Sequence, residues 1–380
     1  MGKHLETALY ILVALAVVFS LANTAIVLDK SAKARAVVRQ AELDAQPANI
    51  DLTIITAASC KTCFDIAPVI DSLKKANVKI TSEKAIDASS AEAKQLIEKY
   101  GISRLPTIMV SGELGKPSVK SFFSNGWQVS IDTAVYSAVL PPYADVAGNI
   151  KGLVSLTQIS DESCSKCADM SLVINFFRQA GVKFSTEKEA DYKTSEAQEL
   201  IAKFGVDRVP AIIVSKDVLE YSAVAEVWPQ LGATEKENMF ALHTTSPPYR
   251  DLAENKIVGL TKVVYLSDKS CATCYDVSIN KNILAGLGVT IADESRIDIA
   301  DAEGKGYLEK YSIIKVPIII LSPEASAYSR FVAAWKQVGD IASDDWYVMR
   351  NPNVLGTYKD LTTGQVVAPQ ARAASSDNGQ

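Results

Sequence analysis

The sequence predicts an α/β fold that is repeated three times in tandem, and three observations lead to this prediction. All six cysteines fall into CxxC pairs, which are Cys60/Cys63, Cys164/Cys167 and Cys271/Cys274. A proline lies 43 residues beyond the second cysteine of each pair, at Pro106, Pro210 and Pro317. A similar segment precedes each proline, reading AEAKQLIEKYGI, SEAQELIAKFGV and AEGKGYLEKYSI. The matching spacings indicate one structural unit of about 100 residues used three times.

The hydrophobic pattern of the first unit predicts the order strand, helix, strand, helix, strand, strand, helix. The predicted strands cover residues 50–57, 78–86, 106–110 and 119–123, and the predicted helices cover 64–76, 90–100 and 132–139. The first cysteine pair then lies where the first strand turns into the first helix.

Composition narrows the class of function. The chain has 380 residues, of which 48% are hydrophobic, and this can bury about three cores of domain size. The net charge of −5 shows no basic excess, which argues against a nucleic-acid partner. The two histidines, His4 and His243, do not recur between units. Chemistry common to the three units therefore does not rest on histidine.

The N-terminal segment differs from the repeats. Residues 8–28 carry no charged side chain, which matches the roughly 20 apolar residues that span a bilayer. Ser31-Ala32-Lys33-Ala34 is a poor cleavage site, so residues 1–28 are predicted to be an uncleaved single-pass anchor with the membrane as a partner. The repeats are expected outside the cytoplasm, although the basic residues that follow the segment favour the opposite orientation.

The repeat also sets the expected domain boundaries. The second and third units open alike, with Pro141-Pro142-Tyr143 and Pro247-Pro248-Tyr249. Residues 356–361 repeat this opening, but no fourth cysteine pair follows them. We therefore expect a stalk over 29–46, domains over 47–142, 143–248 and 249–362, and a disordered tail over 363–380.

A CxxC pair at a strand-to-helix junction suits redox chemistry. The first cysteine would lie near unpaired backbone N–H groups and the positive end of the helix dipole, so its thiolate is stabilised and its pKa is lowered. The second is close enough to form a short disulfide and to resolve a mixed disulfide with a substrate. All six cysteines are therefore candidate catalytic residues.

This order, with CxxC after the first strand and a proline opening a later strand, resembles the thioredoxin superfamily over residues 48–361. The resemblance implies three tandem thioredoxin-like domains, each βαβαββα with a mixed sheet flanked by helices, after the N-terminal transmembrane helix. It also implies cis peptide bonds before Pro106, Pro210 and Pro317, with the residue before each proline docking the substrate backbone. Those docking residues are Leu105, Val209 and Val316.

The chain departs from the best-known pattern of the superfamily. Serine (Ser59, Ser163 and Ser270) stands where a tryptophan commonly precedes the first cysteine. The position six before the first cysteine, where the family often buries an acid, holds Ile54, Gln158 and Tyr265. A general thioredoxin-like reductase is therefore disfavoured.

Other charged residues recur and could tune a cysteine pKa or relay a proton. They are Asp65, Asp169 and Asp276, two residues after the second cysteine; Glu83, Glu187 and Glu294, 23 residues after the first; and Arg104, Arg208 and Lys315, two before the proline. The alternative interpretation is structural. In that case the aspartates favour the positive end of a helix, the glutamates are charges on a strand, and the cations are solvated loop charges.

Two classes of function follow. The first is a membrane-anchored thiol–disulfide oxidoreductase or isomerase, like the multidomain protein disulfide isomerases, with thiol-bearing proteins and a redox partner protein as partners and no cofactor. The second is a non-catalytic binding or spacer array in which each CxxC is a permanent disulfide. No metal site is expected, because zinc-binding CxxC pairs are usually separated by ~15–20 residues, whereas these lie in separate units.

Overall fold

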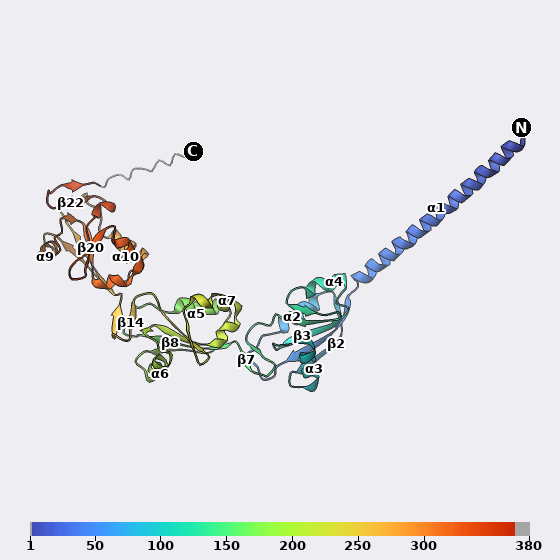
Figure 1. Ribbon diagram of the computed structural model, residues 1–380, viewed down its shortest axis with the longest axis horizontal. Helices are drawn as coiled ribbons and strands as arrows, with labels where there is room; N and C mark the ends of the chain where they lie inside the picture. Colours follow the sequence, from blue (N-terminus) through green and yellow to red (C-terminus); the bar gives the residue numbers. More distant parts are fainter. Residues whose placement is uncertain (1, 369–380) are drawn as a thin grey trace. The chain divides into compact units, whose positions relative to one another are not determined.

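The structure is a computed structural model that describes residues 2–368 (Figure 1). The described residues form two compact units, which divide between Leu153 and Val154, and three five-stranded sheets. The first sheet lies in the first unit and the other two lie in the second. We call the segments that carry the sheets module 1 (residues 48–151), module 2 (153–258) and module 3 (261–367).

Module 1 has a mixed sheet in the order β2-β1-β3-β5-β4. Its strands are β1 (Ala48–Thr56), β2 (Val78–Asp87), β3 (Thr107–Gly112), β4 (Trp127–Val129) and β5 (Thr133–Tyr136). Strand β1 pairs in parallel with β2 and antiparallel with β3.

Two hydrophobic clusters cover the two faces of this sheet. Leu73 of α2 (Ala67–Lys75) and Val119 of α4 (Pro117–Lys120) belong to one cluster, together with Ile50 of β1. Ala93 of α3 (Ala91–Tyr100) belongs to the other cluster, together with Ile55. The alternation of side chains along β1 therefore separates the helices onto opposite faces.

Modules 2 and 3 repeat this arrangement. Module 2 contains β8 (Leu153–Ser160), α5 (Ser171–Gln179), β9 (Lys183–Asp191), α6 (Ser195–Phe204), β11 (Ala211–Ser215), α7 (Ser222–Val227), β12 (Thr234–Lys236) and β13 (Met239–His243). Module 3 contains β16 (Thr261–Ser267), α8 (Ile279–Gly286), β17 (Ile291–Asp298), α9 (Ala302–Lys310), β19 (Ile318–Leu321), α10 (Ser329–Trp335), β20 (Gly339–Ile341) and β21 (Tyr347–Met349). The mixed α/β fold with three sheets is confirmed.

A short β-hairpin, which we call the strap, closes each module. Strap 1 is β6 (Tyr143–Ala144) and β7 (Ile150–Lys151), strap 2 is β14 (Tyr249–Asp251) and β15 (Lys256–Val258), and strap 3 is β22 (Tyr358–Asp360) and β23 (Val366–Val367). Strap 2 pairs with β10 (Arg208–Val209), strap 3 pairs with β18 (Lys315–Val316), and Leu105 bridges to Ala144 of strap 1. The Pro-Pro-Tyr segments, which were expected to open the second and third units, therefore belong to the module that precedes them.

Two of the predicted elements in module 1 are wrong. Residues 119–123, predicted as a strand, form the end of α4 and the 3-10 helix η1 (Ser121–Phe123), because Pro117 suits a first helical turn and Val119 and Phe123 are buried one turn apart. Residues 132–139, predicted as a helix, contain β5 instead, in which Thr133, Ala134 and Val135 are buried in the sheet. The last element of module 1 is the strap and not a helix.

The predicted helix at 64–76 begins later, at Ala67, because Pro68 lies in its first turn and the N–H of Phe64 donates to the carbonyl of Pro142, which directly precedes strap 1. The equivalent helices α5 and α8 begin at Ser171 and Ile279. The first cysteine of each pair therefore lies more than one turn before the helix, where the dipole field has fallen off.

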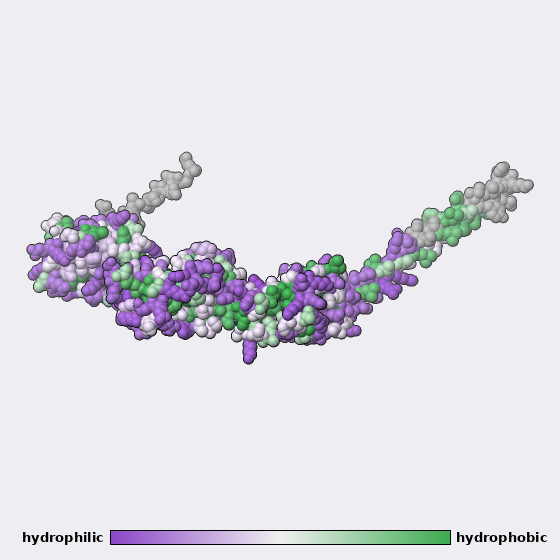
Figure 2. All heavy atoms as spheres, turned by 60° about the horizontal axis from the view of Figure 1, so that its bottom comes forward, coloured by the Kyte–Doolittle hydropathy of each residue, from purple (hydrophilic) through white to green (hydrophobic). Residues whose placement is uncertain are grey.

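The expected membrane anchor is contradicted. No helix among the described residues combines the length and the apolar character that a bilayer crossing requires. Residues 8–28 belong to α1 (Gly2–Ala45), which continues without a break through the charged segment expected as a stalk. The anchor at 1–28, the membrane partner through residues 8–28 and the extracytoplasmic placement of the modules therefore lack support. Figure 2 shows apolar side chains on this helix, and Val18, Phe19 and Leu21 are exposed.

Of the expected disordered tail, residues 363–380, the structure describes only residues 363–368. Residues 366–367 form β23 of strap 3. Residues 369–380 lie outside the part of the chain that the structure describes.

Candidate functional site

Each CxxC pair forms a disulfide in the turn between the first strand and the first helix of its module. The two Cα atoms are 5.5 Å apart in Cys60–Cys63, 5.3 Å in Cys164–Cys167 and 5.4 Å in Cys271–Cys274. The first cysteine is buried in module 2, where Cys164 is 9% exposed, and is partly buried in modules 1 and 3. Leu105 packs in the same hydrophobic cluster as Cys60 and Cys63. In module 1 this contact brings the residues around the cis-proline, which we call the proline loop (residues 104–106, with 208–210 and 315–317 in modules 2 and 3), to the disulfide.

The peptide bonds before Pro106, Pro210 and Pro317 are cis, as the resemblance implied. Two further cis bonds, before Pro142 and Pro248, lie at the entrances of straps 1 and 2. These two were not predicted from the sequence.

The straps contact both the cysteine turn and the proline loop. The N–H of the residue after the second cysteine donates to the strap entrance, from Phe64 to Pro142 O at 2.7 Å, from Ala168 to Pro248 O at 2.7 Å and from Tyr275 to Thr357 O at 2.9 Å. Leu105 and Ala144 exchange two backbone hydrogen bonds of 2.9 and 2.8 Å. Val209 pairs with Arg250 of strap 2, and Val316 pairs with Lys359 of strap 3. The strap therefore occupies the edge where the resemblance places a substrate backbone.

The cations two residues before the prolines contact the same straps. The Arg104 guanidinium lies 4.5 Å from the centre of the Tyr143 ring, and that of Arg208 lies 4.7 Å from the Tyr249 ring. The Lys315 ammonium lies 5.5 Å from the Tyr358 ring. Cation–π attraction thus helps to hold each strap against its proline loop.

The recurrent carboxylates contact helices and strands. Asp65, Asp169 and Asp276 are exposed, and each accepts the backbone N–H two residues later, at 3.0, 3.1 and 2.9 Å. The exposed glutamates pair with cations of the first helix, Glu83 with Lys74, Glu187 with Arg178 and Glu294 with Lys281. Their role in tuning a cysteine pKa remains a prediction.

Three further acids, which were not predicted from the sequence, hold the loop before each disulfide. Asp87, Asp191 and Asp298 end β2, β9 and β17, and each accepts the backbone N–H of the residue two before the first cysteine, at 3.0, 2.8 and 2.7 Å. Hydrogen bonds from Ser89 lower the pKa of Asp87. Each acid lies 27 residues after the first cysteine, and this recurrence could have identified them.

Modules 2 and 3 also carry an ion pair between strap and cysteine turn. Arg250 Nε lies 2.6 Å from Asp161 Oδ2, and Lys359 Nζ lies 2.6 Å from Asp268 Oδ2. The acid is three residues before the first cysteine, and each cation also reaches the serine next to that cysteine, Ser163 or Ser270, at 3.3 Å.

Burial alone would raise the pKa of Asp161 and of Asp268, but hydrogen bonds from the neighbouring serine and the strap cation outweigh it, so that both pKa values are lowered. These acids are therefore ionised at neutral pH, and each pair is a true salt bridge. Module 1 has Ala57 and Ala144 at the two positions.

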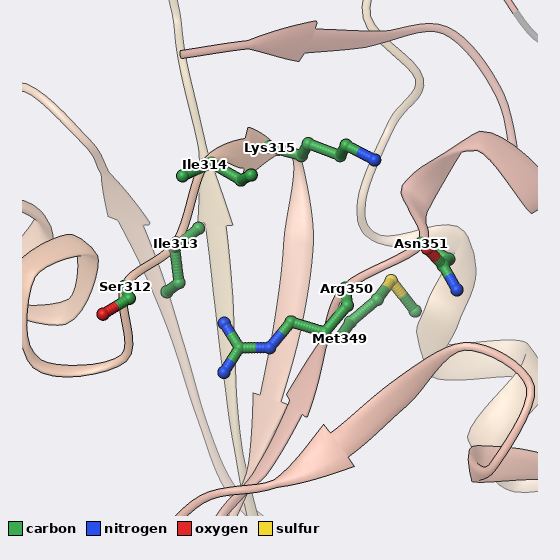
Figure 3. A pocket seen from close by; sticks show the side chains of 7 residues that line it. All are labelled: Ser312, Ile313, Ile314, Lys315, Met349, Arg350 and Asn351. Atoms are coloured by element: carbon green, nitrogen blue, oxygen red, sulfur yellow. The ribbon is translucent and has the colours of Figure 1, made fainter. Parts of the chain in front are cut away.

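A cavity of about 320 Å³ lies in module 3 beside the proline loop (Figure 3). It is lined by residues 312–315 and 349–351, which include Lys315 and Arg350. The Arg350 side chain points toward Ser312 and Ile313, and it donates from Nη1 to Tyr311 O at 2.7 Å. Neither Cys271 nor Cys274 lines this cavity.

No family model matches the chain, and no curated protein is significantly similar to it. Solved structures with local similarity include the alkylhydroperoxide reductase AhpF of Enterococcus faecalis, which is 16% identical over 45% of this chain and 82% of its own, with a TM-score of 0.14. Human ERp44 is 11% identical over 73% of this chain and 79% of its own, also with a TM-score of 0.14. A protein disulfide oxidoreductase from Aeropyrum pernix K1 is 16% identical over 44% and 76%, with a TM-score of 0.13. At such scores the similarity carries no argument about the function of this chain.

Proposed function

We propose that this chain is a thiol–disulfide oxidoreductase that acts on protein thiols through its three CxxC pairs. The observation that supports this function best is the recurrence of one geometry in three modules. In each module a CxxC disulfide lies in a turn that is held by an aspartate of the second strand and by a strap bonded to the cis-proline loop. A disulfide that only staples a loop does not require the same aspartate and strap contacts to its turn in every copy.

The exchange would begin when a substrate thiolate attacks Sγ of the first cysteine, for example Cys60. The bond between the two sulfurs breaks, and Cys63 leaves as a thiolate. A second substrate thiolate then attacks the substrate sulfur of the mixed disulfide and releases Cys60. The substrate is oxidised to a disulfide and the pair is reduced to a dithiol; a small disulfide such as oxidised glutathione restores the pair by the reverse exchange.

A second candidate is supported by the straps. In each module the residue before the cis-proline already pairs with the strap of the chain itself. If the straps never move, this edge takes no substrate backbone, and the modules would form a binding or spacer array with permanent disulfides.

A glutathione redox titration of the full chain, with mass-spectrometric quantification of each cysteine pair, separates the two candidates. An oxidoreductase should show at least one pair with a potential between about −120 and −270 mV. Three pairs that stay oxidised below about −300 mV would overturn the proposed function and leave the binding array.

A further inference from the structure

Module 1 has a cavity of about 490 Å³ beside its cysteine turn. The lining consists of residues 57–59, 87–89 and 144–148 together with Lys94 and Leu105. It therefore extends from the residues that precede Cys60 to strap 1 and to the residue before the cis-proline.

The same positions are filled by side chains in modules 2 and 3. Ala57 corresponds to Asp161 and Asp268, and Ala144 corresponds to Arg250 and Lys359. In module 2 the acid side chain is fully buried and that of Arg250 is 11% exposed. Two alanines leave this space open in module 1.

The ion pairs also indicate what chemistry the open space accepts. In modules 2 and 3 a basic side chain enters from the strap and reaches the serine next to the first cysteine. Module 1 keeps that serine as Ser59 in the cavity wall, but strap 1 has Ala144 at the position of those cations, and its one basic residue, Lys151, does not line the cavity. Two carboxylates, Asp87 and Asp145, line the cavity, whereas only one ammonium, that of Lys94, lies in its wall. The charge of Lys151 acts on Asp145 from outside the lining. Because the carboxylates outnumber the cation in the wall, a cation is favoured there.

We infer that this cavity is the substrate-binding site of the chain, and that it takes a cysteine-containing polypeptide segment with a basic residue next to the cysteine. The basic side chain enters the cavity between strap 1 and the cysteine turn and brings the neighbouring sulfur to Cys60. The ion pairs close the equivalent sites, so modules 2 and 3 exchange with polypeptides more slowly. The inference rests on the proposed oxidoreductase function and names its substrate class and its most accessible site.

The test uses the full chain with Cys63→Ser, Cys167→Ser and Cys274→Ser, which leaves one free thiol in each module. The probe is a peptide whose single cysteine is joined by a disulfide to 2-nitro-5-thiobenzoate, with arginine or, as the matched control, glutamate beside the cysteine. A module thiolate attacks the peptide sulfur and releases the coloured aromatic thiolate, and mass spectrometry shows which cysteine holds the peptide. We expect the arginine peptide to label Cys60 roughly tenfold faster than Cys164 or Cys271, as about 1.4 kcal/mol of differential binding would give. It should also label Cys60 about threefold faster than the glutamate peptide does, which corresponds to the free energy that one exposed ion pair contributes.

One double variant is designed to fill the cavity in module 1, and a second is designed to open the equivalent space in module 2. Adding Ala57→Asp and Ala144→Arg fills it, and labelling of Cys60 by the arginine peptide should fall to the rate of Cys164. Adding Asp161→Ala and Arg250→Ala opens module 2, and labelling of Cys164 should rise toward the rate of Cys60; this second variant decides the question if the first does not fold. Labelling by free 5,5′-dithiobis(2-nitrobenzoate), which does not need the cavity, should change little in either variant.

Equal labelling of the three cysteines by the arginine peptide, or no response to either double variant, would overturn the inference. The glutathione titration of the cysteine-intact chain is independent of this outcome. Three resistant disulfides there would refute the oxidoreductase function itself, whereas exchangeable disulfides with no peptide discrimination would refute only the assignment of the cavity.

Discussion

Strap 1 and strap 2 have the same backbone contacts but differ in how their side chains attach them. In both, a strap carbonyl accepts the N–H of the residue after the second cysteine, the strap pairs with the residue before a cis-proline, and a tyrosine lies under a cation. Strap 2 adds the buried pair of Arg250 and Asp161, whereas strap 1 has Ala144 opposite Ala57.

Modules 1 and 2 differ at both positions of the ion pair, because burying one charged side chain without its partner costs free energy of folding. A lone acid or lone cation at this position would lack its counter-charge in a site with little access to water. Two alanines avoid this cost and leave room for a ligand. The backbone contacts thus define the module, and one pair of positions determines whether the space beside the disulfide is open.

The largest expected effect comes from breaking the pair in module 2. Asp161→Ala leaves Arg250 nearly buried without its counter-charge and should lower the free energy of unfolding of module 2 by about 3–5 kcal/mol. Asp161→Ala with Arg250→Ala reproduces the arrangement of module 1 and should cost clearly less. Urea unfolding followed by hydrogen exchange of peptides from β8 and β11 measures the loss within module 2.

Asp268→Ala in module 3 is the matched comparison. Its partner Lys359 is 25% exposed and can be solvated, so this loss should be smaller than that of Asp161→Ala. A double variant in module 2 that is as unstable as the single variant would show that the pair does not act as a unit.

A second contrast concerns the residue after the second cysteine, which is Phe64 in module 1 and Tyr275 in module 3. The Tyr275 hydroxyl donates to the carbonyl of the cis-proline Pro317 at 3.1 Å, and burial raises the pKa of Tyr275 to about 12. Because the folded chain holds this proton more tightly than the unfolded chain, the contribution is present below pH 10 and is lost as the pH rises toward 12.

Module 3 should therefore lose about 2–3 kcal/mol of stability between pH 10 and 12 through this group. The Tyr275→Phe variant should be less stable at neutral pH by about 1 kcal/mol, for the lost hydrogen bond, and should fall less steeply above pH 10. Parallel slopes for the two proteins in alkaline urea unfolding would contradict this role, and module 1, with Phe64, provides the internal reference.

The sequence predicted the parts of the module that depend on local pattern. The cysteine pairs, the cis-prolines and the first four elements follow from spacing, periodicity and the resemblance. The strap was not predicted. The Pro-Pro-Tyr segments were expected to open a unit, whereas they pair with the residue before the preceding cis-proline, because Pro141-Pro142-Tyr143 marks a chain reversal without showing which module the reversed chain pairs with. The ion pair of Asp161 and Arg250 was missed for a related reason, since it joins residues far apart in the chain whose proximity depends on that pairing.

Short elements were misassigned where burial overrides periodicity. Thr133, Ala134 and Val135 are all buried, so they show neither the helical nor the alternating pattern. The recurrence of the acids Asp87, Asp191 and Asp298 could have been predicted from their common spacing after the first cysteine. Their function depends on a backbone N–H, which no side-chain pattern reveals.

The smallest expected effect compares the end of the second helix in the three modules. Gly101 and Gly205 follow α3 and α6 with φ of 64° and 67°, whereas module 3 has Ser312 at the same place with φ of 51°. Left-handed backbone costs a residue with a side chain about 1–2 kcal/mol, and the greater freedom of unfolded glycine offsets part of this. Ser312→Gly should therefore raise the free energy of unfolding of module 3 by about 0.5–1 kcal/mol in urea.

Gly205→Ser is the matched reversal, because an added Cβ there meets no atom within 4 Å, and it should destabilise module 2 by a similar amount. Ser312→Ala keeps a Cβ and should change little, so a gain in that variant as large as in Ser312→Gly would show that the hydroxyl of Ser312, and not its backbone conformation, limits the stability of module 3.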